Sequence, residues 1–209
     1  MKNLLVIVLA IYMTGCANTA PLVPVVYGKP ATVTSGQTAT IELYTGVVTG
    51  DAASTLFPVG NNFFVPVATG PATSVHFAEG DQLRFLESLS SELNRMKVLH
   101  VLEFGRDISM ASDQVLRVTF LRTHHDPDFQ VYTLDVALQI EGGDNVFVNQ
   151  YHIVSHTSLK EKLFSNASRG KEKAATKLLE KVVDDIQLYL AQSAAGNEYS
   201  KASHHPAAN

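Results

Sequence analysis

The sequence lacks the residues on which several classes of protein depend. Its 209 residues contain one cysteine, Cys16, so neither an intramolecular disulfide nor a multi-cysteine metal cluster can form. Only 17% of the residues are charged, and 16 Lys+Arg against 20 Asp+Glu give a formal charge of −4. This balance argues against the basic surface of a dedicated nucleic-acid binder. The 45% of hydrophobic residues, in contrast, can bury a core, which excludes wholesale disorder.

Recognisable catalytic motifs are also missing from the sequence. It contains no HExxH, no GxSxG, no GxGxxG and no glycine-rich loop ending in GK[ST]. Ser168 and Lys171 fit the pattern S-x-x-K, in which a lysine could activate a serine. The SDN and KTG patterns that accompany it in penicillin-recognising enzymes are absent, and Ser168 has a simpler role near a helix start. We therefore expect no enzymatic activity and no catalytic residue.

The spacing of the histidines does not favour a metal site. His124, His125 and Asp126 are adjacent, and adjacent residues reach one ion only if their loop folds around it. His152 and His156 lie about 13 Å apart along a strand, too far to share an ion. We expect no metal and no dissociable cofactor.

The longest apolar run lies at the start of the chain. It covers residues 4–13 and is followed by Thr14, Gly15 and Cys16. Ten helical residues span about half of a bilayer's hydrocarbon core, so the run fits the hydrophobic region of a signal peptide and not a membrane-spanning helix. Residues 1–15 are therefore predicted to be a signal peptide.

Residues 13–16 (Met-Thr-Gly-Cys) resemble the bacterial lipobox, Leu-x-Gly-Cys, with Met13 in the place of the usual leucine. The resemblance implies that Cys16 is lipidated and becomes the first residue of the mature protein, with a covalent lipid as its only added group. Related lipoproteins of enteric bacteria that stay in the inner membrane carry Asp after the cysteine. Ala17 stands there in this sequence, which favours the outer membrane, on its periplasmic face, over the inner membrane.

The remaining chain divides into a tether, a domain and a tail. Residues 16–37 contain three prolines and one charge and are predicted to form an extended tether. Residues 38–192 form the predicted periplasmic domain, and residues 193–209 a disordered tail. Within the domain, residues 38–69 carry only two charges. They either cover their own domain or offer a strand edge to a partner.

Hydrophobic periodicity predicts an α+β fold. A strand is expected at residues 38–48. Residues 63–65 form a separate short apolar run that Pro66 stops. A helix begins at Gln82 with Asp81 as its cap, and a second helix spans residues 171–191. Between them, strands are predicted at residues 98–104, 115–123, 130–140 and 146–156.

Strict alternation in residues 130–140 places Leu134 and Val136 inside and Thr133 and Asp135 outside. We expect an antiparallel sheet packed on one face by two helices, with a β-rich N-terminal extension. This layout is similar to that of several small bacterial lipoproteins with a sheet backed by two helices.

The second predicted helix carries its charges against the helix dipole. Residues 160–181 hold seven basic and three acidic residues, whereas Asp184 and Asp185 come later. One interpretation is a solvated face with internal pairs such as Lys181 with Asp185. The other is a face that binds an anion or an acidic partner through Lys171, Lys173 and Lys177.

From these features we expect an outer-membrane lipoprotein that serves as a non-enzymatic accessory or assembly subunit of a cell-envelope complex. Its partners would be the membrane, through the lipid, and an envelope protein, with no nucleic acid. The alternative is a lipid- or solute-handling auxiliary lipoprotein of an envelope transport system, which would need an apolar cavity between sheet and helices.

Overall fold

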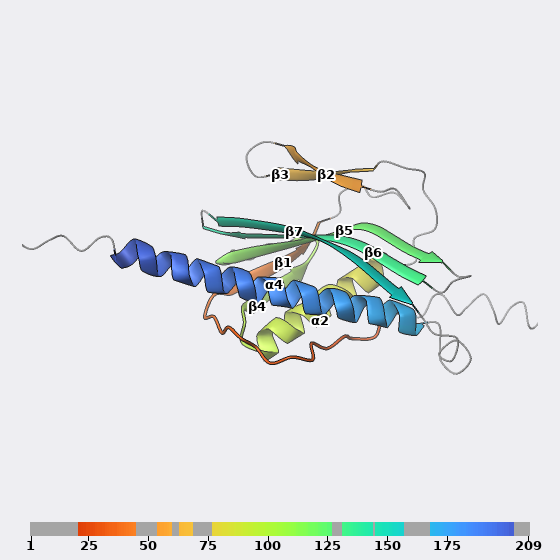
Figure 1. The fold of residues 1–209 in the computed structure, drawn as a ribbon, viewed down its shortest axis with the longest axis horizontal. Helices are drawn as coiled ribbons and strands as arrows, with labels where there is room; N and C mark the ends of the chain where they lie inside the picture. Colours follow the sequence, from red (N-terminus) through yellow and green to blue (C-terminus); the bar gives the residue numbers. More distant parts are fainter. Residues whose placement is uncertain are drawn as a thin grey trace, which may run out of the picture.

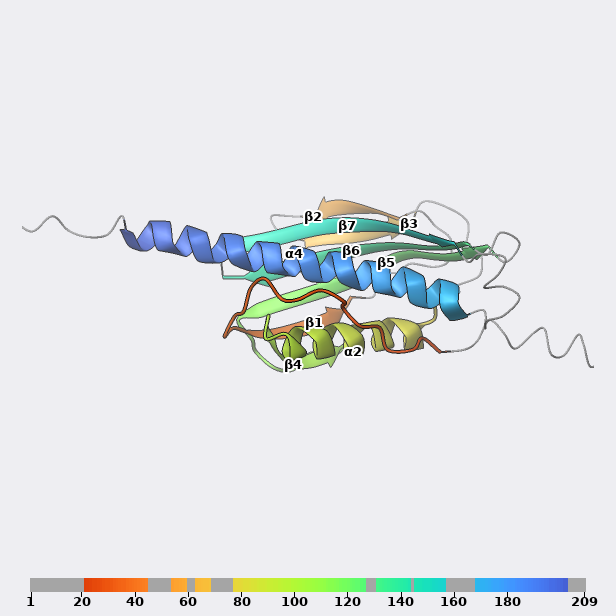
Figure 2. The same cartoon turned by 60° about the horizontal axis from the view of Figure 1, so that its bottom comes forward.

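A computed structural model gives the fold, in which two helices pack on one face of a five-stranded sheet (Figures 1 and 2). This arrangement confirms the α+β class and the packing of both helices on one side. Neither helix offers, within the described residues, a stretch long and apolar enough to cross a membrane. The structure describes residues 21–44, 54–59, 63–68, 77–126, 131–143, 145–156 and 168–202. The signal peptide, Cys16 and residues 203–209 lie outside these ranges.

The sheet is mixed, so the prediction of a wholly antiparallel sheet is wrong. Its strand order is β4-β1-β5-β6-β7, and β1 pairs in parallel with both of its neighbours. The strands β5, β6 and β7 follow one another through short connections and are therefore antiparallel, as predicted. The chain reaches β4 from β1 only after helix α2, a crossover that allows parallel pairing. The strands are β1 Thr38–Leu43, β4 His100–Gly105, β5 Gln114–Asp126, β6 Val131–Gly142 and β7 Asn145–His156.

The core lies between the sheet and the helices α2 (Glu79–Arg95) and α4 (Ser168–Ala202). Leu134 and Val136 are buried, whereas Thr133 and Asp135 are partly exposed, so the predicted faces of β6 are confirmed. The predicted apolar stripe of α4 is also buried throughout: Ala174, Ala175, Leu178, Leu179, Val182, Val183, Ile186 and Leu190.

A small hairpin lies on the opposite face of the sheet (Figures 1 and 2). It consists of β2 (Ser54–Val59) and β3 (Phe63–Ala68), and β2 lies near β5. The hairpin favours the interpretation that this under-charged segment covers its own domain. Pro66 does not end β3 as predicted but pairs with Leu56, because each strand of a two-stranded hairpin has an outer edge that tolerates proline.

Residues 21–37, here called the N-terminal segment, are not a free tether. The segment has no regular secondary structure, but Leu22, Val25 and Tyr27 are buried in the core. It runs along both helices on the side away from the sheet (Figure 2). Its backbone is held by helix side chains: Leu22 N donates to Asp81 Oδ1 at 2.7 Å, and Val25 N to Ser88 Oγ at 3.2 Å. The folded domain therefore begins by Leu22 and not at residue 38.

Both helices begin or end at other residues than predicted. Helix α2 starts at Glu79, after Ala78, and no side chain caps it. Asp81, the predicted cap, is instead buried inside the fold. Helix α4 continues to Ala202, so the predicted disordered tail is helical over residues 193–202. Alanines are frequent there and proline is absent, which permits the helix to extend past the sheet (Figure 1).

Candidate functional site

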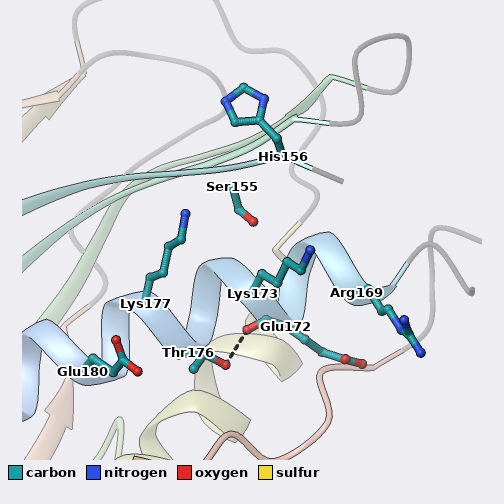
Figure 3. Close-up of a pocket in the computed structure, with 8 residues that line it drawn as sticks. All are labelled: Ser155, His156, Arg169, Glu172, Lys173, Thr176, Lys177 and Glu180. Carbon is teal, nitrogen blue, oxygen red and sulfur yellow. Dashed lines mark hydrogen bonds between the residues drawn. The ribbon is translucent and has the colours of Figure 1, made fainter. Parts of the chain in front are cut away.

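A hollow lies where the end of β7 meets the first turns of α4 (Figure 3). Its volume is about 660 Å³, within the usual range of ligand pockets, about 300–1,000 Å³. We call it the α4 hollow, and most of the side chains around it are polar or charged. They are Ser155, His156, Arg169, Glu172, Lys173, Thr176, Lys177 and Glu180.

Two of the three predicted anion-binding lysines line this hollow. Lys177 Nζ donates to the carbonyl oxygen of Val154 at 3.1 Å, so its ammonium group is held against β7. Figure 3 shows Lys173 and Lys177 extending toward the strand that carries Ser155, whereas Glu172 and Glu180 extend away from it. The two lysines are therefore the charged side chains of the hollow that extend toward Ser155, although Glu172 and Glu180 also line it.

Ser155 is the member of the hollow that sequence reasoning missed. Its side chain is 1% exposed, and within the described residues its hydroxyl has no hydrogen-bond partner. The alternation of β7 contained a signal, because Tyr151, Ile153 and Ser155 all fall on the buried side of the strand. A serine at a core position of such a strand needs a partner for its hydroxyl.

The third predicted lysine, Lys171, does not belong to this surface. It is 3% exposed, and its Nζ lies 2.8 Å from Asp81 Oδ2, in a buried ion pair between the two helices. Helical periodicity explains the difference, since residue 171 falls on the stripe of Ala174, Ala175 and Leu178. Lys171 is therefore not available to an anion or a partner at the surface, and such a role stays a prediction for Lys173 and Lys177.

Two acidic residues near the middle of α4 attach the helix to its neighbours. Asp184 accepts hydrogen bonds from Tyr27 Oη at 2.5 Å and from Lys29 Nζ at 2.6 Å. Partial burial raises the pKa of Asp184, but the bonds from Lys29 and Tyr27 outweigh it, so the pKa is lowered overall. Asp185 accepts a bond from Tyr151 Oη at 2.7 Å; burial and this carboxylate raise the pKa of Tyr151. Because α4 continues to Ala202, both carboxylates lie near the middle of the helix, away from the end where the helix dipole would disfavour them, and each has a structural partner.

The histidines that were considered as metal ligands have other neighbours in the fold. Among the described residues, no three His, Cys, Asp or Glu side chains are grouped to hold an ion. His125 is buried and stacked on Tyr132, with 4.0 Å between ring centroids. His152 Nδ1 lies 2.5 Å from Asp135 Oδ1. Residues 127–130, which complete the predicted histidine loop, lie outside the described residues.

A second surface of interest is the outer edge of the sheet at β4. In the part of the chain that the structure describes, β4 pairs with no strand other than β1, and on its outer side the Asn94 side chain bonds the backbone N–H of Val101 at 2.9 Å and its carbonyl oxygen at 3.4 Å. Leu102, Phe104 and Met110 are 37%, 41% and 54% exposed there, and we call them the β4 edge. Glu103 Oε2 accepts the backbone N–H groups of Ser109 and Met110, each at 2.9 Å. These bonds lower the pKa of Glu103 and hold Met110 beside the strand.

Comparison with known proteins defines the fold but not a family. No family model matches the chain, and no curated protein matches it. The fold is similar to the crystal structure of protein XCC0632 from Xanthomonas campestris, which carries the family model DUF330. The TM-score is 0.54 at 10% identity, over 84% of this chain and 98% of that chain. An uncharacterized protein of known structure gives a TM-score of 0.35 at 13% identity, over 83% and 94%, which is too low to bear on the fold. At 10% identity, the likeness to XCC0632 shows a shared arrangement of helices and strands.

Proposed function

We propose that this chain is an outer-membrane lipoprotein, anchored through Cys16 and facing the periplasm, that acts as a non-enzymatic accessory or assembly subunit of a cell-envelope complex. The observation that carries the proposal is the β4 edge. No described strand pairs with its outer side, and the side chain of Asn94 bonds the N–H and C=O only of Val101, so the rest of this edge can accept a strand from a partner. The exposed apolar side chains of Leu102, Phe104 and Met110 add the kind of surface that protein partners cover.

The short link between Cys16 and the domain supports a position at the membrane surface. Leu22 is fixed by Asp81, and only six residue steps separate it from Cys16. Fully extended, six steps reach at most about 22 Å. A triacylated Cys16 would be a stable anchor, because even two acyl chains suffice. Such an anchor would hold the start of the N-terminal segment close to the lipid head groups.

The packing of the core bears on the alternative, a lipid- or solute-handling auxiliary lipoprotein. That function calls for an apolar cavity between the sheet and the helices. Instead, the described leucines between these layers are closely covered, and Leu134, Leu138 and Leu178 are at most 1% exposed. The accessory-subunit function therefore has the better support.

Two matched substitutions test the role of the β4 edge. Leu102→Asp and Leu188→Asp both place a carboxylate at an exposed leucine, and Leu188 lies on α4 at 52% exposure. We expect gently solubilised wild-type membranes to show the protein in an assembly larger than a monomer on native gels. Leu102→Asp should shift most of it to the monomer mass, since a buried carboxylate at an apolar contact is costly. Leu188→Asp should leave the assembly intact.

The result distinguishes the β4 edge from the surface of α4 around Leu188 as the place where the partner binds. Loss of the assembly with Leu188→Asp alone would move the contact to α4, and a monomer in the wild type would contradict the accessory-subunit function.

A separate substitution tests the anchor. Cys16→Ser removes the thiol to which the lipid would be attached. We expect metabolic labelling with a clickable fatty acid to mark the wild type and not the variant, which should accumulate as unprocessed precursor. Equal labelling of both proteins would contradict lipidation at Cys16.

A further inference from the structure

We propose that the α4 hollow binds the phosphate of an anionic lipid head group in the membrane that carries the anchor. The first observation is the hydroxyl of Ser155, which is buried at the hollow and has no partner within the described residues. Buried hydroxyls in native proteins are almost always hydrogen-bonded. A phosphate oxygen in the hollow would supply the missing acceptor.

The second observation is the direction of the charges. Lys173 and Lys177 extend toward the Ser155 side, and Lys177 Nζ is steadied there by the Val154 carbonyl. Two ammonium groups and a hydroxyl donor on one side of a hollow match a phosphate, which carries several acceptor oxygens and a negative charge. Glu172 and Glu180 also line the hollow, but their side chains extend away from Ser155, which leaves the side with Lys173 and Lys177 positive.

The third observation is the place of the hollow in the domain. Asp81 holds Leu22 with one carboxylate oxygen and Lys171 with the other, so the first turn of α4 lies where the chain leaves toward Cys16. Lys173 and Lys177 follow within about 9 Å along the helix. If Cys16 is lipidated, as the proposed function requires, the hollow lies at the end of the domain that faces the membrane. This step alone rests on the proposed function.

Vesicle flotation tests the site with the mature chain, residues 16–209, carrying Cys16→Ser so that no lipid anchor contributes. We expect this protein to float with vesicles of phosphatidylcholine and phosphatidylglycerol and not with phosphatidylcholine alone. The double variant Lys173→Gln with Lys177→Gln should bind about thirtyfold more weakly, from about 1 kcal/mol for each lysine. Binding should also fall at high salt, as the Debye length shortens.

Two further variants separate a built site from general charge attraction. Lys181→Gln removes the same charge from an exposed position on α4 that does not line the hollow, and it should weaken binding much less than Lys173→Gln. Ser155→Ala should weaken binding severalfold while leaving the melting temperature unchanged or higher, because it removes a buried hydroxyl that has no partner among the described residues. A merely structural serine would show the opposite pattern, with a lower melting temperature and unchanged binding.

The results that overturn the inference are distinct. Equal binding to both kinds of vesicle, or equal loss with Lys181→Gln and Lys173→Gln, would exclude a head-group site in the hollow. Binding of inorganic phosphate, followed by the amide resonances of Ser155 and Thr176, without binding to phosphatidylglycerol would make the ligand a free phosphate and overturn the assignment to lipid. Because these assays use neither the lipid anchor nor the β4 edge, their failure leaves the accessory-subunit proposal standing.

Discussion

The two flanks of the first turns of α4 use lysine in opposite ways. On one flank, Lys171 is buried against Asp81 and joins the two helices. On the other, Lys173 and Lys177 are exposed and line the α4 hollow. The difference is one of helical phase, because residue 171 falls on the apolar stripe and residues 173 and 177 do not. The basic residues of this run therefore do not form one surface, because the position of each lysine around the helix decides whether it is buried or exposed.

The largest expected effect comes from breaking the buried pair. Lys171→Gln should lower the free energy of unfolding by about 3–5 kcal/mol, because it leaves the carboxylate of Asp81 buried without its cation. Lys173→Gln should change it by no more than about 0.5 kcal/mol, as is usual for an exposed position. Urea unfolding of both variants measures the difference. Combining Lys171→Met with Asp81→Asn should recover most of the loss, since the Asn side-chain oxygen can still accept the Leu22 N–H. Equal effects of Lys171→Gln and Lys173→Gln on the free energy of unfolding would show that the two flanks do not differ.

An adjacent pair in the N-terminal segment gives the second comparison. Leu22 is fully buried and Val23 is 53% exposed. Leu22→Ala should lower the free energy of unfolding by about 2–5 kcal/mol, because it removes core contacts and leaves a cavity. Val23→Ala should lie within about 0.5 kcal/mol of the wild type. Thermal or urea unfolding of both variants measures the difference. If Leu22→Ala did not change the stability, residues 21–37 would be a tether and not part of the folded domain.

The smallest expected effect concerns Asp184, where the same segment meets α4. Its pKa is lowered in the fold, so the stabilisation by its ionised form is present above the unfolded pKa of about 3.9 and is lost as the pH falls through the folded pKa. The pair with Lys29 is partly exposed, and Asp184→Asn should cost at most about 1 kcal/mol at pH 7.

This difference from the wild type should shrink between pH 5 and the acid limit, as followed by urea unfolding at several pH values. Asp107→Asn, at an exposed residue away from the segment, controls for the change in charge. A difference that grows toward acid pH would contradict the lowered pKa.

Periodicity predicted the parts of the fold that bury apolar side chains in a regular pattern. The apolar stripe of α4 and the alternation of β6 each predict which side of the element is buried, and both predictions are confirmed. The parallel pairing of β1 was not predictable in this way, because its partners lie far along the chain and pairing leaves no mark on a single strand. The N-terminal segment was mistaken for a tether because its buried residues, Leu22, Val25 and Tyr27, follow no regular period, and its polar bonds to distant helix side chains such as Asp81 leave no local pattern.

For the candidate site, sequence analysis indicated the basic residues but did not predict that Lys171 is buried while Lys173 and Lys177 are exposed. The phase of Lys171 could have been recognised from the spacing to Ala174 and Leu178. Ser155 could have been recognised from the alternation of β7. That these two elements meet at a hollow depends on the contact between α4 and β7, which only the folded structure supplies.

The course of the N-terminal segment has a mechanical consequence. If Cys16 is fixed in a membrane while the domain is fixed to a partner, any movement of one against the other becomes tension at Leu22. The segment lies along the helices, so a pull parallel to them loads several bonds together, from Leu22 with Asp81 to Thr32 with Gln187. Resistance to such a pull is set by the rate of unfolding and not by the equilibrium stability. The helices would then act as a strain-bearing joint that passes force from the lipid anchor into the core before it reaches the sheet.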